Sequence, residues 1–390
     1  MEKNFKIEDL LKIAKRENNN KRSYLYVNMI QGKHVPVSPT KSLELFSKMA
    51  RKLEEDYPTE ELMVVGFAET ATAIGTAIAY EASNVKYYIS TTREELSDAE
   101  YLFFTESHSH AMEQKLVVNG LDECLKNVDR IIFAEDEVTT GNTIEKLVNV
   151  FQKRFPEQAK KFGIISIVNS MLENRIEQLK SRDISCHYLY KIPQEYQIEK
   201  IDSYKFEKLK RAKKIVENDS GIPITINDYW NSRIVSTTDC LRQRVEKFVD
   251  DVKKVVNISK NKSKILILGT EEFMFPGMFL GKRLEEQYPK LEMKFHATTR
   301  SPIEVSLHEG YPLHSRTILD SLYEKGRKTY LYNLDSYDAV YIITDAAPLN
   351  SEGVNTLVES LKDFGNTRII LIKWGENEVN IEEKVENNCD

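Results

Sequence analysis

The sequence predicts an α/β fold with two tandem domains, each built on a mostly parallel sheet, the second being a degenerate copy of the first. Two observations support this fold class. Apolar segments with the length of buried strands alternate with amphipathic helical segments along the chain. In addition, the order of segments in residues 37–148 recurs in residues 235–358, about 200 positions later.

Length and composition describe an ordinary globular chain. It has 390 residues, of which 41% are hydrophobic and 30% charged, a length that suits about two to three domains. The formal net charge of −6 argues against a protein that holds nucleic acid in a basic field. No segment reads as a signal peptide or a membrane span. We expect a cytoplasmic protein without a disulfide framework or a zinc site, because no C-x-x-C pair occurs among Cys124, Cys186, Cys240 and Cys389.

The first half contains the expected elements in a regular order. Helices are expected where apolar residues recur every three to four positions, and strands where short apolar runs end at polar or small residues. In chain order we expect a helix at 5–16, strands at 24–30 and 62–67 on either side of a helix at 41–55, a small-residue loop at 68–75, a helix at 76–81, strands at 87–90, 116–118 and 131–134, a helix through 144–148, a strand at 162–168, a helix at 171–179 and a strand at 184–190.

The stretch at 130–148 carries the most specific chemistry. An apolar run at 131–134 ends at Glu135, Asp136 and Glu137, and a Thr/Gly turn then opens a helix. Small hydroxyl residues and glycine let backbone N–H groups converge on a phosphate at a helix N-terminus. Carboxylates just before such a turn can accept hydrogen bonds from two neighbouring sugar hydroxyls. A 5-phosphorylated ribose satisfies both demands.

The motif Glu135-Asp136-x-Val138-Thr139-Thr140-Gly141-x-Thr143 resembles the phosphoribosyl-pyrophosphate (PRPP) loop of type I phosphoribosyltransferases. In that family the acid pair holds the ribose 2- and 3-hydroxyls, the Thr/Gly loop holds the 5-phosphate, and a loop after the first core strand receives the pyrophosphate. One departure is Glu137, which stands where the family usually has an aliphatic residue. The resemblance implies a PRPP site made of Ala68, Glu69, Thr70, Ala71, Glu135, Asp136, Thr139, Thr140, Gly141, Asn142 and Thr143.

Further polar residues follow the strand at 87–90. Arg93 lies just beyond its carboxyl end, where open α/β sheets bind ligands, and can pair bidentately with pyrophosphate. The polar loop at 103–115 corresponds by position to the family's mobile loop, which closes over the reacting ribose. Two alternatives for this loop are a zinc ion shared by two histidines and a plain surface loop. The expected catalytic residues are Arg93, Glu106, His108, His110 and Lys115.

The second half repeats these elements with losses. Residues 235–241, 265–272, 295–300 and 341–358 restate 37–43, 63–69, 88–93 and 131–148 in the same order. Asp345 is kept at the position of Glu135, but Ala346 replaces Asp136, and Leu349-Asn350-Ser351 replaces the Thr-Thr-Gly turn. We therefore expect the second copy to bind PRPP poorly.

The whole arrangement resembles bacterial proteins in which an orotate-phosphoribosyltransferase-like domain precedes a domain named for a Thr-Arg-Ser-Pro (TRSP) motif, here Thr299 to Pro302. The resemblance implies two tandem Rossmann-like phosphoribosyltransferase-type domains. We expect a PRPP-binding domain at 1–200, a linker at 201–234 and a TRSP pseudo-phosphoribosyltransferase domain at 235–390. Such proteins are associated with tellurite-resistance and stress gene clusters and with making a nucleotide-like metabolite.

The resemblance implies a Mg²⁺-dependent phosphoribosyltransferase that transfers 5-phosphoribosyl from PRPP to a base-like nitrogen acceptor and releases pyrophosphate. Mg²⁺ would bridge oxygens of PRPP rather than sit in a protein cage. A non-catalytic PRPP-sensing regulator is the alternative function. Neither nucleic acid nor membrane is an expected partner. We expect an intramolecular pseudo-dimer, with a homodimer as the alternative, in which the second domain contributes Arg300, Ser301 or His314 to the first domain's site.

Overall fold

The computed structural model describes residues 5–17, 22–104, 114–158, 160–207, 223–256 and 263–375. They form two compact units, which we name after their central strands. The β3 unit holds the described residues of Glu44–Gln194 and Tyr229–Lys247, and the β12 unit those of Met1–Leu43, Glu195–Asp228 and Phe248–Glu378. Each unit therefore combines segments from both halves of the chain. The domain boundaries expected near residues 200 and 235 stay a prediction.

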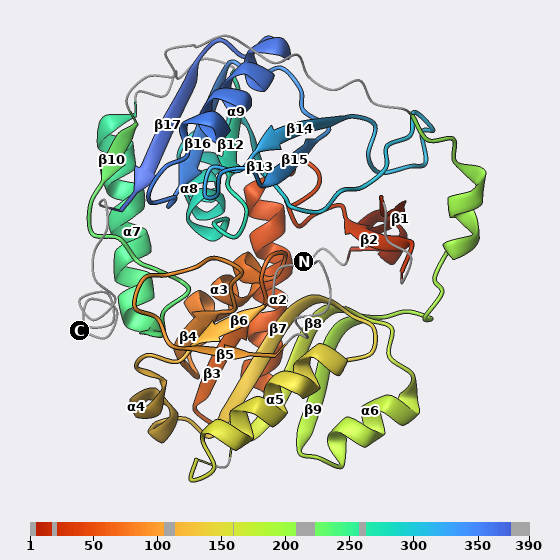
Figure 1. The fold of residues 1–390 in the computed structure, drawn as a ribbon, viewed down its shortest axis with the longest axis vertical. Coiled ribbons are helices and arrows are strands. Elements are labelled where there is room, and N and C mark those ends of the chain that lie inside the picture. Colours follow the sequence, from red (N-terminus) through yellow and green to blue (C-terminus); the bar gives the residue numbers. More distant parts are fainter. Residues whose placement is uncertain are drawn as a thin grey trace. The chain divides into compact units, whose positions relative to one another are not determined.

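The β3 unit is built on a six-stranded sheet (Figure 1). Its strands are parallel except β11, which pairs antiparallel with β4 at one edge. β3 and the first part of β7 are buried on both faces, which explains why their sequences are continuous apolar runs. The order across the sheet is β11 (Ser236–Thr237), β4 (Val85–Ser90), β3 (Leu62–Gly66), β7 (Arg130–Val138), β8 (Lys161–Asn169) and β9 (Ile184–Lys191).

The direction of winding changes between β3 and β7. From β3 the chain passes through α3 (Thr72–Glu81) to β4 on one side, whereas from β7 it passes through α5 (Asn142–Arg154) to β8 and through α6 (Glu173–Lys180) to β9 on the other. Because such crossovers are right-handed, the two directions leave a crevice outside the carboxyl ends of β3 and β7. Loops that bind a ligand in this fold class are expected at that place.

A small antiparallel hairpin adds to the same unit. It joins β5 (Tyr101–Phe103) to β6 (Lys115–Val117), and an isolated bridge pairs Thr92 with Lys115. The short helix α4 (Leu121–Lys126) follows β6. The hairpin is therefore attached just beyond the carboxyl end of β4.

The β12 unit has a five-stranded parallel main sheet (Figure 1). Helices α8 (Phe275–Gln287) and α9 (Ser351–Asp363) connect β12 to β13 and β16 to β17. A hairpin of β14 (Arg316–Asp320) and β15 (Lys328–Tyr332) and the short helix η1 (Ile198–Ser203) complete the unit. The order is β10 (Ile224–Ile226), β17 (Ile369–Trp374), β16 (Ala339–Thr344), β12 (Lys264–Gly269) and β13 (Glu292–Ala297). The predicted α/β class with mostly parallel sheets is thus confirmed.

The helix expected at 5–16 is wrong for most of its length. Only α1 (Ile7–Leu10) is helical, and the next residues form β1 (Leu11–Lys15), which pairs antiparallel with β2 (Tyr24–Asn28). The apolar side chains of this hairpin join a core cluster with Ile303 and Tyr311. Local helical spacing was overruled because packing in the β12 unit requires an extended chain here.

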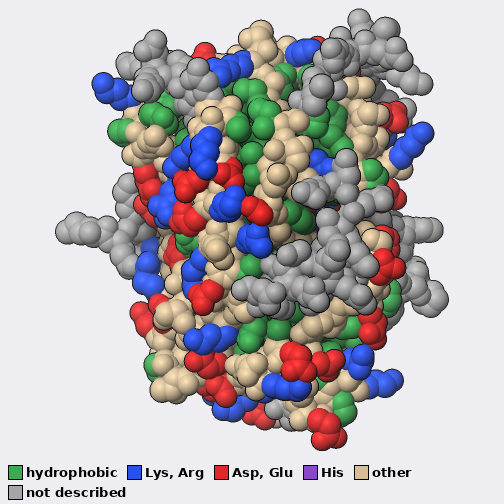
Figure 2. All heavy atoms as spheres, turned by 90° about the vertical axis from the view of Figure 1, so that its left-hand side faces the viewer, with side chains coloured by type: hydrophobic (Ala, Val, Ile, Leu, Met, Phe, Trp, Pro, Cys, Tyr) green, Lys and Arg blue, Asp and Glu red, His purple; other side chains and the backbone are tan. Residues whose placement is uncertain are grey.

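Two amphipathic helices of equal length follow corresponding segments of the two halves, α2 (Pro39–Asp56) and α7 (Thr238–Val255). The segment before each helix pairs with an edge strand: Val37 forms an antiparallel bridge to Phe295 of β13, and Ser236 pairs antiparallel with Tyr88 of β4. Among the described helices, none has the length and apolar character needed to cross a membrane. Figure 2 shows acidic and basic side chains interspersed over the face that it displays.

Candidate functional site

Three carboxylates mark the end of β7, in the β3 unit. Glu135, Asp136 and Glu137 are partly buried, and Asp136 Oδ1 accepts a hydrogen bond of 3.0 Å from the hydroxyl of Thr70. Burial raises the pKa of Glu135 well above its usual range, the charges of Asp136 and Glu137 raise it further, and the nearby Arg93 opposes them. The strand end is therefore an acidic position that favours ligands able to donate hydrogen bonds.

The turn after β7 leads into the N-terminus of α5. Gly141 precedes the helix with φ +68°, the left-handed region that glycine adopts without strain. Asn142 and Thr143 form the exposed first turn of α5, next to Thr139 and Thr140. The first backbone N–H groups of a helix have no partner within the helix, so this turn can present donors to an anion.

Arg175 of α6 supports this turn, a residue that the sequence analysis did not single out. Its guanidinium donates to the carbonyl oxygen of Thr140 at 3.0 Å and to Asn142 Oδ1 at 3.2 Å. The same group pairs with the carboxylate of Glu145 at 2.5 Å. Arg175 therefore fixes the shape of the turn and adds positive charge beneath it. The sequence contained no signal for this contact because Arg175 lies more than 30 positions away.

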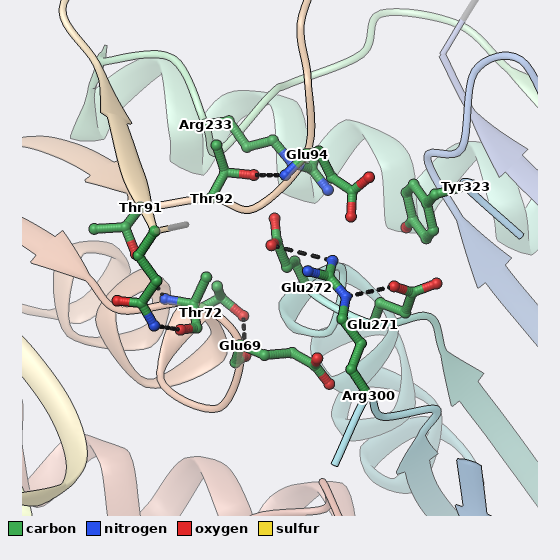
Figure 3. Close-up of polar contacts among 12 residues, drawn as sticks. Glu69, Thr72, Thr91, Thr92, Glu94, Arg233, Glu271, Glu272, Arg300 and Tyr323 are labelled. Atoms are coloured by element: carbon green, nitrogen blue, oxygen red, sulfur yellow. Dashed lines mark hydrogen bonds and ion pairs between the residues drawn. The ribbon is translucent and has the colours of Figure 1, made fainter. Parts of the chain in front are cut away.

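The loop at residues 68–71 follows β3 on the other side of the crevice. The N–H of Ala68 donates to Thr91 Oγ1 at 2.8 Å, and its carbonyl oxygen accepts from Gln114 Nε2 at 2.7 Å. Glu69 is buried, and its carbonyl oxygen accepts from Thr72 Oγ1 at 3.3 Å (Figure 3). These bonds tie the loop to the carboxyl end of β4 and to the hairpin.

Close packing of α3 holds the same loop near β7. A Cβ atom on Gly75 would lie 2.7 Å from the Cα of Gly66, so the helix and β3 approach as closely as two glycines allow. The hydroxyl of Thr70 can then reach Asp136 across the change in winding direction. The structure therefore brings the predicted 68–71 loop and the predicted acid pair together.

Arg93 and Lys115 lie near the carboxyl end of β4. The charge of Arg93 opposes the raised pKa of Glu135, which places the two groups in the same electrostatic environment. The ammonium group of Lys115 is buried, pairs with Glu95 and lies 4.5 Å from the centre of the Tyr101 ring. Lys115 is thus anchored in the hairpin by a carboxylate. The other predicted catalytic residues, Glu106, His108 and His110, lie outside the described residues.

The three residues predicted to assist from the second domain lie in the β12 unit. Arg300 donates to Glu271 Oε2 at 2.6 Å and pairs with Glu272 at 3.2 Å (Figure 3). The N–H of Ser301 donates to Thr299 Oγ1 at 3.2 Å, and a ring nitrogen of His314 lies 3.0 Å from the carbonyl oxygen of Ser306. All three have partners inside their own unit, and their proposed reach to the first domain's site stays a prediction.

The carboxyl edge of the β12 sheet is filled by a buried ion network. Besides Arg300, Glu271 pairs with Arg327 at 3.5 Å, and Asp345 accepts from the hydroxyl of Tyr323 at 2.6 Å. The side chain of Glu271 is 1% exposed. Ions buried to this degree must be mutually satisfied, because a single unpaired partner is strongly destabilising. Within the described ranges, no group of three or more His, Cys, Asp or Glu residues is arranged to hold a metal ion.

The sequence matches two protein-family models. Residues 10–192 match the model of a phosphoribosyl transferase family, and residues 236–361 match the TRSP domain that lies C-terminal to it. The chain therefore contains a phosphoribosyl transferase domain of this family, followed by a TRSP domain. A search among curated proteins gives no match.

Several solved structures are similar over part of the chain. Adenine phosphoribosyl transferase from Trypanosoma brucei, solved with AMP, pyrophosphate and ribose-5-phosphate, is 13% identical over 47% of this chain and 78% of its own, with a TM-score of 0.34. The adenine enzyme from Thermoanaerobacter pseudethanolicus is 13% identical over 48% and 98%, with a TM-score of 0.33. Orotate phosphoribosyltransferase from Aeropyrum pernix is 12% identical over 39% and 72%, with a TM-score of 0.27.

Proposed function

We propose that the β3 unit binds PRPP and transfers its 5-phosphoribosyl group to a base-like nitrogen acceptor. The observation that carries this proposal is the meeting of two loops at the carboxyl ends of β3 and β7, joined by the bond from Thr70 to Asp136. One loop offers an acid pair and a glycine-shaped helix N-terminus, and the other bonds Thr91, two residues before Arg93. These groups match the ribose, the 5-phosphate and the pyrophosphate of one ligand.

The roles of the residues follow from their chemistry. Glu135 and Asp136 accept hydrogen bonds from the ribose 2- and 3-hydroxyls, and the turn of Thr139, Thr140, Gly141, Asn142 and Thr143 holds the 5-phosphate. The loop of Ala68, Glu69, Thr70 and Ala71 receives the pyrophosphate together with Arg93, whose planar guanidinium suits bidentate pairing. Catalysis then rests on stabilising the leaving pyrophosphate and excluding water from a ribosyl centre of oxocarbenium character.

Mg²⁺ suits this set of donors. The acidic end of β7 offers carboxylate oxygens, which are the hard ligands that Mg²⁺ prefers, and most of its remaining ligands would be PRPP oxygens and water. Bound Mg²⁺ supplies positive charge that neutralises the pyrophosphate.

We further propose that the β12 unit is a degenerate copy of the same fold. The strand order β4-β3-β7-β8 of one sheet corresponds to β13-β12-β16-β17 of the other, both wholly parallel. A hairpin follows the edge strand in each, bridged by Thr92 to Lys115 and by Thr299 to Tyr330. In the copy, the carboxylates of Glu271 and Glu272 pair with Arg300, which stands at the position of Arg93. An intramolecular pseudo-dimer stays a prediction, as does a homodimer.

The decisive experiment titrates PRPP with Mg²⁺ into the wild-type protein and the Asp136→Asn variant by calorimetry. Asn keeps an oxygen that can accept from Thr70 but loses the charge, so we expect a folded protein with weaker binding. Asp129→Asn is the matched control, because Asp129 precedes the opposite end of β7, where its carboxylate accepts a hydrogen bond of 2.8 Å from the N–H of Glu61. Equal binding by wild type and Asp136→Asn would refute the assignment of the acid pair.

A second measurement separates the enzyme from the PRPP-sensing regulator. The PRPP-bound protein is screened against base-like acceptors for release of pyrophosphate, and without acceptor for slow hydrolysis to ribose 5-phosphate. Release with one acceptor establishes the transferase and names its substrate class. Tight binding with neither release nor hydrolysis favours the sensor.

A further inference from the structure

The segment of residues 229–237, here called the edge segment, lies mostly between the two matched family regions, and its residues 229–234 were expected to belong to the linker. It is an ordered part of the β3 unit. The carbonyl oxygen of Ser232 accepts from the N–H of Ser90 at 2.6 Å and from its hydroxyl at 3.0 Å. The indole of Trp230 is buried, donates to Ser236 Oγ at 2.9 Å and lies 5.9 Å from the Tyr88 ring.

The direction of the edge segment brings Arg233 to the ligand edge of the sheet. Because β11 runs antiparallel to β4, with Ser236 opposite Tyr88, the residues that precede Ser236 run toward and past the carboxyl end of β4. Arg233 follows Ser232, which bonds the last residue of that strand. Figure 3 shows Arg233 beside Thr92 and Glu94.

The electrostatic surroundings agree with this position. Burial raises the pKa of Tyr101 in the hairpin, and the positive charge of Arg233 opposes that rise. The side chain of Arg233 is 5% exposed. A guanidinium stays charged when it is buried, so negative or polar groups around it must offset the free energy lost by removing it from water. Its N–H and guanidinium both contact Asn231 Oδ1, at 3.1 and 3.5 Å.

We propose that Arg233 is a further pyrophosphate-binding residue of the site, an inference that rests on the proposed binding of PRPP. The same edge carries the carboxylates of Glu69 and Glu94, which repel a pyrophosphate, and the ammonium of Lys115 pairs with Glu95. Arg93 alone would leave this edge with an excess of negative charge. Arg233 supplies a second guanidinium beside Thr92, so that two arginines can bind the two phosphates.

The β12 unit contains the equivalent arrangement. There the segment before α2 pairs antiparallel with the edge strand β13, through Val37 and Phe295. Lys33, in that segment, is wholly buried, and its ammonium donates to the carbonyl oxygens of Glu271 at 2.5 Å and Thr298 at 2.9 Å. In both units, therefore, the segment before the long helix delivers a buried cation to the carboxyl edge. In the β12 unit backbone carbonyls accept hydrogen bonds from this cation, whereas Arg233 lies in the unit that carries the intact PRPP motif.

Three variants of the full chain test this assignment: Arg233→Gln, Arg233→Lys and the control Arg242→Gln. Arg242 belongs to the same unit, and its guanidinium donates to the carbonyl oxygens of Tyr80 at 2.8 Å and Ala82 at 3.2 Å, at the C-terminus of α3. Its loss is expected to lower stability without changing ligand affinity. Calorimetric titrations use three ligands with Mg²⁺: PRPP, inorganic pyrophosphate, and ribose 5-phosphate, which lacks the pyrophosphate.

We expect Arg233→Gln to weaken PRPP and pyrophosphate about tenfold or more, the effect of one lost charge-assisted hydrogen bond, and to leave ribose 5-phosphate unchanged. Arg233→Lys should recover part of the affinity because it keeps the charge. Equal weakening of all three ligands, or no weakening, would overturn the role of Arg233 while the proposed function stands. A wild-type protein that binds neither PRPP nor pyrophosphate would overturn the proposed function and this inference with it.

Discussion

Gly141→Ala tests whether the shape of the turn before α5 sets PRPP affinity. The backbone at Gly141 has φ +68°, which an L residue adopts at a cost of about 1–2 kcal/mol. Alanine recovers about 0.4–1 kcal/mol of this by restricting the unfolded chain. Its Cβ would meet Met171 Sδ at 3.2 Å and Leu179 Cδ1 at 3.3 Å, both ends of flexible side chains that can shift slightly. The net loss of stability is therefore about 1 kcal/mol, or about 2–4 °C in Tm.

The expected effect on binding is larger than the effect on folding. If the turn relaxes toward negative φ, the N–H groups at the start of α5 no longer converge on the 5-phosphate. Losing one such bond to a charged group is worth about 1.5–3 kcal/mol, or roughly tenfold to a hundredfold in Kd. Calorimetry measures the PRPP affinity, and differential scanning calorimetry measures the Tm.

Two further variants control for backbone strain. Gly326→Ala places an alanine at φ +88° with no neighbour within 4 Å, in the hairpin of the β12 unit, so it should cost similar stability without changing PRPP affinity. Gly141→Asn should recover binding, because asparagine tolerates the left-handed region. The reasoning is refuted if Gly141→Ala binds PRPP like the wild type, or if Gly326→Ala loses affinity to the same degree.

Three further predictions concern buried charges. Burial raises the pKa of Glu135 in the folded protein. Its contribution to the free energy of unfolding is therefore present at low pH and is lost as pH rises through the folded-state pKa. In urea unfolding at pH 5 and 8, the Glu135→Gln variant should be more stable than the wild type only at pH 8. Burial lowers the pKa of His296 to about 4. The folded protein should therefore lose about 3 kcal/mol of stability as pH falls from about 6.5 through 4. The fluorescence of the buried Trp374, in the same unit, should report this loss in unfolding curves measured across that range. Arg300→Gln should destabilise the β12 unit by about 3 kcal/mol or more, because it removes the nearest cation of the buried Glu271 and leaves only the longer pair with Arg327. Arg283→Gln, which removes an exposed pair, should cost less than about 1 kcal/mol in urea unfolding.

The sequence was most informative where chemistry and periodicity coincide. The strands around β3 and β7 were predicted because continuous apolar runs are typical of parallel strands buried on both faces. The PRPP motif could be placed at one sheet edge because parallel strands share the direction of their carboxyl ends. The contact of Thr70 with Asp136 joins two segments that the family resemblance had assigned to one ligand.

Long-range pairing is what the sequence could not provide. Residues 11–15 have helical spacing but form β1, because their partner Tyr24–Asn28 and the core around Ile303 decide their conformation. Arg175 and Arg233 gave no local signal, since their roles depend on which turn or strand end they meet in the fold. The pairing of Arg300 with Glu271 likewise joins positions that no motif connects.

The pairing of segments from the two halves gives a physical reason for keeping a C-terminal half that lacks the PRPP motif. The β3 sheet takes its edge strand β11 from the start of the second repeat, together with Trp230, which packs on Tyr88. The β12 sheet in turn receives Val37 and Lys33 from the first repeat. A cut at residue 200 would therefore expose the edge of β4 and remove the Ser232 contact from Ser90. Loss of the edge segment would thus alter the strand end that precedes Arg93, so this segment constrains the C-terminal half even without a PRPP motif.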